Sequence, residues 1–428
     1  MKNIADVEKK RPKNTLAYTS RLTGIEVVLK LSSNCNLDCS YCYYYHRGND
    51  EAAEYAGVIS KHNLEAVTEF FKQGILDLGL EWLRIDFHGG EPMLMKKSRF
   101  DWMCAHFTKE LSPHLKMLQF AMQTNAVLVD DEWVNLFAKH QVCVGVSLDG
   151  PKQYNDIFRL DKKGQSSYQD TVDGTALLRD AYESGRIPSL GVLCVINPEF
   201  DARHIYTHFI DDLGFKGFDF LLPDYTHDNY EKGHEKAYGK FLVDLFRLWS
   251  EGDYKENQIR IMNNAIARFS GDSSSSFTSF SAEEKQEISF SIQTDGLLGP
   301  DDTFFSTPIW KECSHPHVST ISLRDYLNGE LFIKIDKESR TIPDDCKSCC
   351  WQNVCGGGSE APNRYSSTTN TTLQPSVHCD ALKEFYSEVA AFLLKNGMHP
   401  DRLLNLLFGK EELEAVQHQE KKQAALAH

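Results

Sequence analysis

The stretch GIEVVLKLSSNCNLDCSYCYYY, residues 24–45, decides the fold of this 428-residue chain. It begins as an apolar run typical of a buried β-strand and ends in three cysteines, Cys35, Cys39 and Cys42, spaced Cys-x3-Cys-x2-Cys. Three thiolates on one loop can converge on a single cube of iron and sulfide. A fully ligated cluster takes four cysteines, so three of them leave one iron open to another ligand.

The same spacing also suits a structural zinc site. Structural zinc needs a closed tetrahedral shell of four ligands, and His46 would supply the fourth here. The sequence that follows the cysteines favours iron-sulfur, because further polar motifs stand at the ends of the next predicted strands.

Composition excludes several classes of protein. The net charge of -15 disfavours nucleic acid and anionic membranes as partners, because both attract clustered Lys and Arg. No apolar run approaches the ~20 residues of a membrane span, and no hydrophobic stretch follows the first charges as in a signal peptide. We therefore expect a cytoplasmic protein, in which the 12 cysteines indicate metal ligation or catalysis rather than disulfides.

Strand-like and helical patterns alternate from residue 24 to residue 224. This repeated βα signal predicts a parallel sheet curled into a full or partial barrel, whose chemistry gathers at the carboxyl ends of the strands. The strand candidates are GIEVVLKLSS (24–33), EWLRIDF (81–87), LKMLQFAMQT (115–124), QVCVGVSLD (141–149), PSLGVLCVI (188–196) and FKGFDFLL (215–222).

Polar motifs end three of these predicted strands. The second strand ends in His88-Gly89-Gly90-Glu91-Pro92, where glycines allow a close backbone approach and Glu91 can accept a hydrogen bond from an ammonium group. The third ends in Gln123-Thr124-Asn125. The fourth ends in Ser147-Leu148-Asp149-Gly150-Pro151, with Arg159 shortly after. Taken singly, each motif is also compatible with a turn or a loop cap.

In this order and at these strand ends, the motifs resemble the SPASM-type radical S-adenosylmethionine (SAM) maturases over roughly residues 24–380. The resemblance implies a partial (β/α)6 radical SAM barrel with a C-terminal SPASM-like iron-sulfur domain, an α/β fold. It also implies a [4Fe-4S] cluster on the three cysteines, with SAM bound to the open iron. The residues that it assigns to SAM are Tyr41 beside the adenine, the turn Gly89, Gly90, Glu91 and Pro92 at the amino group, Asn125, and Ser147 and Arg159 near the ribose or carboxylate.

A second cysteine cluster follows in CKSCCWQNVC and HCDALKEFY. Four thiolates suffice for a closed auxiliary [4Fe-4S] cluster, and a zinc knuckle is the alternative. The candidate ligands are Cys346, Cys349, Cys355 and Cys379.

Related maturases carry a first auxiliary cluster as well. Its family pattern needs a cysteine where this chain has Ser359, and another in the segment DGLLGPDDTFF (295–305), which has none. The resemblance therefore implies that this cluster is absent, with Cys313 and Cys350 as spare thiols or ligands of a partial site. It also aligns Asp302 with the aspartate base of anaerobic sulfatase maturases. The other interpretation of Asp302 is a solvated loop carboxylate.

These features predict an enzyme that modifies a ribosomally made precursor peptide. The stretch KLSSNCNLDCSYCYYY and the altered auxiliary region resemble maturases that crosslink aromatic residues through a carbon-carbon or ether bond, as in cyclophanes of the triceptide or darobactin kind. A formylglycine-generating sulfatase maturase, a thioether-forming maturase and a zinc-stabilised peptide-binding module are the alternatives. The resemblance implies a flavodoxin or ferredoxin as electron donor.

The expected organisation is an extension (1–23), the barrel (24–240), a helical linker with a Ser-rich loop (241–285), the auxiliary domain (286–380) and C-terminal helices (381–428). Many peptide maturases carry a leader-binding domain of about 80 residues, which residues 1–23 are too few to form. We expect a leader peptide to use the polar segment after Asp224, a sheet edge or the C-terminal helices.

Overall fold

A computed structural model of the chain describes residues 22–46, 52, 54–55, 57–252, 256–270, 287–358 and 360–409. Most of the predicted N-terminal extension, the Ser-rich loop, Ser359 and the polar tail after residue 409 lie outside the described residues. Within them, no helix is long and apolar enough to cross a membrane.

In the described part of the chain, nine strands form one sheet in the order β7-β6-β5-β4-β3-β2-β1-β8-β9. The six strands predicted from the sequence are β1 to β6, and they pair in parallel in chain order, which confirms the α/β barrel. The strands are β1 Gly24–Ser32, β2 Trp82–Gly89, β3 Met117–Thr124, β4 Val142–Ser147, β5 Leu190–Val195, β6 Gly217–Leu221, β7 Gln258–Ile259, β8 Glu287–Ile292 and β9 Leu298–Gly299.

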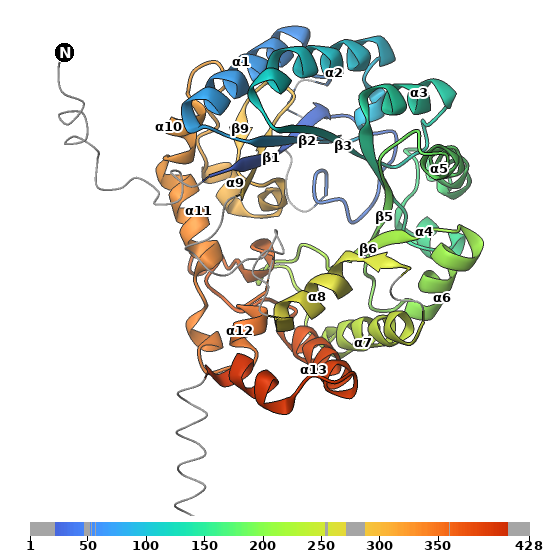
Figure 1. The fold of residues 1–428 in the computed structure, drawn as a ribbon, viewed down its shortest axis with the longest axis vertical. Coiled ribbons are helices and arrows are strands. Elements are labelled where there is room, and N and C mark those ends of the chain that lie inside the picture. The colour runs from blue at the N-terminus through green and yellow to red at the C-terminus, as the bar shows by residue number, and fades with distance from the viewer. Residues whose placement is uncertain are drawn as a thin grey trace, which may run out of the picture.

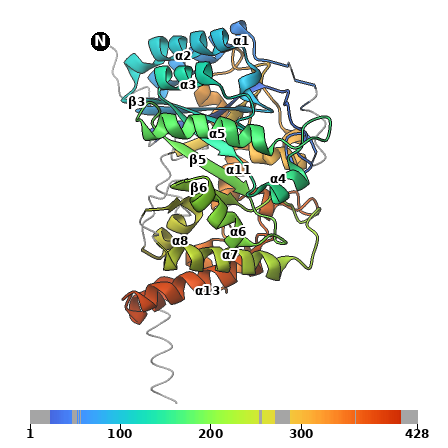
Figure 2. The same cartoon turned by 90° about the vertical axis from the view of Figure 1, so that its right-hand side faces the viewer.

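Helices α1, α2, α3 and α5 follow the outer side of the curved sheet, and α6, α7 and α13 close its other end (Figure 1). Figure 2 shows α13 running beneath α7. The helices are α1 Lys61–Leu78, α2 Lys97–Leu111, α3 Asp131–His140, α4 Lys152–Phe158, α5 Tyr168–Glu183, α6 Ala202–Thr207, α7 Glu235–Glu251, α8 Arg260–Ser270, α9 Pro308–Glu312, α10 Leu323–Leu327, α11 Glu330–Arg340, α12 Gln352–Cys355 and α13 Cys379–Lys395.

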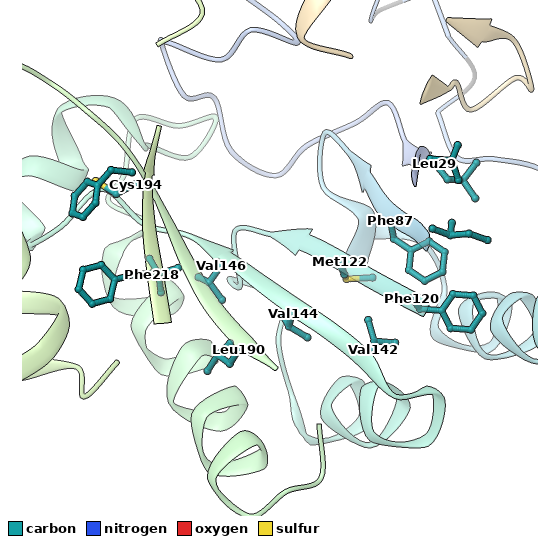
Figure 3. Packing of buried hydrophobic residues seen from close by; sticks show 14 of the residues in the cluster. Leu29, Phe87, Phe120, Met122, Val142, Val144, Val146, Leu190, Cys194 and Phe218 are labelled. Atoms are coloured by element: carbon teal, nitrogen blue, oxygen red, sulfur yellow. The ribbon is translucent and has the colours of Figure 1, made fainter. Parts of the chain in front are cut away.

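The two faces of the sheet differ in chemistry because successive side chains of a strand point to opposite sides. On β2, Leu83, Ile85 and Phe87 are fully buried against the helices. The alternate residues Arg84 and Asp86 face the inside of the barrel and pair with each other. Figure 3 shows how the apolar side chains of neighbouring strands pack into one continuous core. The barrel therefore has an apolar shell and a polar interior.

The segment FSIQTDGLLG, in which Asp295 and Gly296 indicate a turn, forms a hairpin of antiparallel β8 and β9, with Gly296 at φ +89°. The sequence did not indicate where this hairpin lies. Strand β8 pairs in parallel with β1, so the barrel sheet continues directly into the section that precedes the second cysteine cluster. This pairing brings Asp302, which follows β9, next to the interior face of β1.

Candidate functional site

A cavity of about 520 Å³ lies at the carboxyl ends of strands β1 to β6. We call it the central cavity. All but one of the residues predicted for the cluster, SAM or the base line this cavity: Cys35, Cys39, Cys42, Tyr41, Gly89, Gly90, Glu91, Asn125, Ser147, Arg159 and Asp302. The exception is Pro92, which is buried in a short turn and does not line the cavity.

The three cysteine side chains are partly buried on the loop after β1. Burial raises the pKa of the Cys35 thiol to about 12, and it also raises the pKa of Cys39 and of Cys42. The thiolate is the form that ligates metal, and a raised pKa opposes its formation. Positive charge from a bound metal group would favour the thiolate. The loop therefore has the chemistry of an iron-sulfur ligand set.

The zinc alternative lacks its fourth ligand. His46 turns to Asp38, whose carboxylate lies 2.7 Å from its ring nitrogen, and 43% of the His46 side chain is exposed. A single zinc ion also needs its thiolates about 2.3 Å from one point. Across the described ranges, no three His, Cys, Asp or Glu side chains are grouped so as to hold one ion. The geometry therefore favours a cluster, which spreads its ligands over a larger cage.

The glycine turn after β2 packs directly on the cysteine loop. The Gly90 amide donates to Ser32 O (2.8 Å), and the Glu91 amide donates to Asn34 O (2.8 Å). A Cβ on Gly89 would lie 2.1 Å from Ser32 O, and one on Gly90 would lie 2.4 Å from Asn34 O. The close approach that the glycines allow is thus to the cysteine loop itself, which the sequence alone did not reveal.

Glu91 is buried and already satisfied by protein donors. Its carboxylate accepts hydrogen bonds from the Met93 amide (3.0 Å), the Thr124 hydroxyl (2.8 Å) and the Asn125 amide (2.9 Å). Burial raises its pKa, although these hydrogen bonds act in the opposite direction. Glu91 therefore ties the ends of β2 and β3 together, and any contact with a ligand adds to that role.

Tyr41 belongs to a buried polar group that fixes the cysteine loop to the far side of the barrel. Its hydroxyl donates to Asp149 Oδ2 (2.6 Å) and accepts from Arg159 Nη1 (2.8 Å). The charge of Arg159 also acts to lower the pKa of Cys39, against the larger effect of burial. Asn125 donates to Asn36 on the same loop (2.8 Å). Ser147 accepts from Gln123 (2.7 Å) at the cavity wall.

Asp302 is a buried, charge-paired carboxylate and not a solvated one. Its Oδ2 accepts from Lys30 Nζ (2.5 Å) and from the Tyr43 hydroxyl (2.6 Å), and His88 Nδ1 lies 3.2 Å from the same ammonium. Burial alone would raise its pKa, but Lys30 and His88 lower it to about 2. Asp302 is therefore ionised at neutral pH and is a weak base in this arrangement.

Sequence reasoning missed Lys30, although a signal was present. Lys30 is a lysine within an otherwise apolar strand, and its side chain is completely buried. A charged residue in a barrel strand points to the interior, where a partner must compensate it. That partner, Asp302, lies 272 residues away in sequence, so only the β1–β8 pairing identifies it.

The second cysteine cluster forms a separate small cavity. Cys350 is exposed and does not line it, and Cys313 lies elsewhere, donating to Ile309 O (2.8 Å) within an aromatic cluster. The cavity is lined by Cys346, Cys349, Cys355 and Cys379, together with Trp351, Gln352, Gly357, Lys383 and Tyr386. We call it the four-cysteine site. The four predicted ligands are thus brought together, and neither spare thiol joins them.

The chain matches known proteins along most of its length. Residues 29–203 match the family model of the Radical SAM superfamily. The cysteine-type anaerobic sulfatase-maturating enzyme of Clostridium perfringens is 27% identical over 83% of this chain and 93% of its own length. The serine-type enzyme of Bacteroides thetaiotaomicron is 23% identical over 86% of this chain and 89% of its own.

Solved structures agree on the fold. Native anSMEcpe with bound AdoMet and Cp18Cys peptide superposes with a TM-score of 0.72 at 24% identity, covering 87% of this chain and 98% of that one. Streptococcus suis SuiB bound to its precursor peptide SuiA gives 0.55 at 15% identity, covering 85% and 78%. The fold and the cysteine loop define a radical SAM barrel. Residues 29–203 are similar to the radical SAM superfamily, and the chain is an enzyme; the family match implies SAM and a [4Fe-4S] cluster as cofactors.

The Lys30–Asp302 pair makes a testable contribution to stability. Lys30→Met leaves a buried carboxylate without its cation, which we expect to cost about 3 kcal/mol. Lys72→Met breaks the more exposed pair Lys72–Glu110 (2.9 Å), and its loss of stability should be much smaller. Because the pKa of Asp302 is depressed, its contribution is present above the usual ~3.9 and is lost as pH falls toward about 2.

Urea unfolding at several pH values measures these changes. The double variant Lys30→Met/Asp302→Asn should recover most of the loss, because it removes both charges. Strictly additive losses in the two single variants would show that the two side chains do not interact.

The contact between the glycine turn and the cysteine loop makes a second prediction. Gly90→Ala should push the cysteine loop away and lower bound iron from roughly 8 to about 4 per chain, because the four-cysteine site is untouched. Gly191→Ala is the matched control, since its Cβ would meet its nearest neighbour only at 3.9 Å. Equal iron in the two purified variants would refute the proposed role of this contact.

Proposed function

We propose that this enzyme oxidises a side chain of a ribosomally made precursor peptide by hydrogen abstraction with a 5′-deoxyadenosyl radical. The observation that carries the proposal is the convergence of three cysteines, the glycine turn and a buried charge network on one central cavity, with a four-cysteine site beside it. The likeness to sulfatase-maturating enzymes over 83% of the chain supports a peptide as the substrate.

The first cluster and SAM are assigned to the central cavity. Cys35, Cys39 and Cys42 hold a [4Fe-4S] cluster, and SAM binds the open iron beside Gly89, Gly90, Glu91, Asn125, Ser147 and Arg159. Pro92 acts indirectly by starting the turn that places the Glu91 carboxylate. Tyr41 also lines a side pocket of about 240 Å³ that adjoins the central cavity and contains Phe158, Tyr225, Tyr230 and Tyr238. This aromatic pocket suits the adenine that the resemblance places beside Tyr41.

One auxiliary cluster is assigned, on Cys346, Cys349, Cys355 and Cys379. An aromatic cluster packs beside the Cys42 loop instead of a second set of thiols: Phe305 stacks on Trp310 at 3.9 Å, and Tyr44 lies 5.0 Å from Phe305. Cys313, the thiol in this region, contacts that cluster. This packing supports the absence of a first auxiliary cluster.

We infer that the reaction joins a peptide carbon to an aromatic ring. When bound, the first cluster supplies the electron that cleaves SAM to methionine and the 5′-deoxyadenosyl radical. The radical takes a hydrogen atom from a side-chain β-carbon, the carbon attacks the ring, and loss of one electron and one proton restores aromaticity. A pKa of about 2 makes Asp302 a poor permanent proton store, so a proton that it accepts passes on to water.

Formylglycine formation is the second candidate, and the relatives favour it. Both cysteine-type and serine-type sulfatase-maturating enzymes match most of this chain. Asp302 lines the central cavity where the resemblance places their base. Thioether formation is the remaining peptide chemistry. We further propose a flavodoxin or ferredoxin as electron donor, and the cytoplasm as location, because reduced thiols persist there.

Iron analysis and SAM cleavage test the proposal. Anaerobic wild-type protein should hold roughly 8 irons and release 5′-deoxyadenosine with SAM and dithionite, whereas Cys35→Ala/Cys39→Ala/Cys42→Ala should hold about 4 and release none. Zinc in a colourless protein, or equal iron in both proteins, would favour the zinc-stabilised binding module instead.

Mass spectrometry with an aldehyde reagent separates the two chemistries. A crosslinked peptide and a serine-derived formylglycine both lose two hydrogens, but only the aldehyde reacts with a hydrazide. Peptides with a central Cys or Ser, and peptides rich in Trp, Tyr and Phe, are incubated with enzyme and SAM. We expect a hydrazide-resistant product from the aromatic set. A hydrazide-reactive product from the Cys or Ser set would establish the formylglycine alternative.

A further inference from the structure

One side chain lies between the central cavity and the four-cysteine site. Tyr386 is on α13, two turns after Cys379, and its neighbours Leu382 and Phe385 line the central cavity. Tyr386 lines both spaces, and among the described residues no other side chain is shared by the two linings. The central cavity, which contains the proposed first cluster, and the four-cysteine site are therefore separated at this point by a single aromatic ring.

Contacts on every side hold the Tyr386 ring in place. Arg268 of α8, which also lines the central cavity, donates from Nη1 to the Tyr386 hydroxyl (3.3 Å) and to Val354 O (2.8 Å), next to Cys355. The ring centroid lies 6.3 Å from that of Trp351, which lines the four-cysteine site. Tyr386 is only 6% exposed. Its position is thus fixed relative to both sites.

We propose that Tyr386 is the electron relay between the central cavity and the four-cysteine site. This inference rests on the proposed function, because it requires a cluster at each set of cysteines. Electron transfer slows steeply as the gap between redox centres widens, so an aromatic ring held where the two cavities adjoin shortens the path between them. In the described part of the chain, the two linings meet at no other side chain.

The electrons balance in both directions. During oxidation of a peptide, the substrate radical loses one electron and one proton; the electron crosses Tyr386 to an oxidised [4Fe-4S] cluster at the four-cysteine site, and the proton goes to a base in the cavity. Without peptide, an electron stored at the four-cysteine site would cross back to the first cluster and break the carbon-sulfur bond of a further SAM; the resulting radical takes a hydrogen atom from a C–H bond of a buffer molecule and becomes 5′-deoxyadenosine. The second direction can be measured without knowing the substrate.

The experiment counts SAM cleavage by electrons already in the protein. Protein is reduced with dithionite, freed of reductant by gel filtration and mixed with SAM, and 5′-deoxyadenosine is followed with time. Rapid freeze-quench electron paramagnetic resonance (EPR) follows the signal of the four-cysteine cluster in parallel. The first electron comes from the first cluster and gives a fast phase. The second must cross Tyr386 and gives a slow phase, which is missing in Cys346→Ala/Cys349→Ala/Cys355→Ala/Cys379→Ala.

The variants distinguish the role of the Tyr386 ring from the role of its hydroxyl and from effects on folding. Tyr386→Phe keeps the ring and should keep the slow phase. Tyr386→Leu and Tyr386→Met remove the ring. Both should slow that phase, and the decay of the EPR signal, about tenfold, which is about 1.4 kcal/mol of activation free energy. The fast phase should be unchanged. Phe269→Leu is the matched control, because Phe269 packs 6.3 Å from Tyr386 and lines neither cavity.

Variants of Tyr386 and Phe269 are compared only where they keep roughly 8 irons per chain, and two ringless variants are made so that a fold defect in one does not decide the result. A slow phase of wild-type rate in either ringless variant overturns the relay. The relay is also overturned if wild-type protein with a reduced four-cysteine cluster shows no slow phase. Loss of the fast phase in wild type would instead overturn the proposed function, so the two failures are distinguishable.

Discussion

The close packing of the glycine turn on the cysteine loop is the constraint on which the rest of the site depends. Backbone atoms of Gly89 and Gly90 approach Ser32 and Asn34 so closely that no side chain fits between them. This contact fixes where the three thiols lie relative to the ends of β2 and β3. Glu91 reinforces it by accepting hydrogen bonds from the Met93 and Asn125 amides. Backbone contacts of this kind position the metal loop through the protein's own atoms.

The sequence predicted the features that repeat along the chain or have fixed spacing. Alternating strand and helix patterns gave the order of β1 to β6, and the ends of those strands gave part of the cavity lining. The grouping of Cys346, Cys349, Cys355 and Cys379 also followed from spacing, although their role as ligands stays a prediction. Such features can be predicted because they arise from residues that are near one another in the sequence.

Long-range pairings could not be predicted in this way. The pairing of β8 with β1 places Asp302 on Lys30, and nothing local to residue 302 indicates a buried ion pair there. Tyr386 stands in an amphipathic helix and looks like any other apolar-face residue; it becomes distinctive only because α13 packs between two cavities. Cys143, which the pattern suggests is a core residue, lies half-buried beside Gln119. In each case tertiary structure sets the chemistry of the side chain.

In the proposed mechanism, the central cavity controls charge and the four-cysteine site stores electrons. This mechanism requires that SAM binds the cluster on Cys35, Cys39 and Cys42. The most direct test is EPR of the fully reduced wild-type protein before and after addition of SAM. We expect two cluster signals, of which one changes on SAM addition while the other does not. A spectrum that SAM leaves unchanged would contradict it.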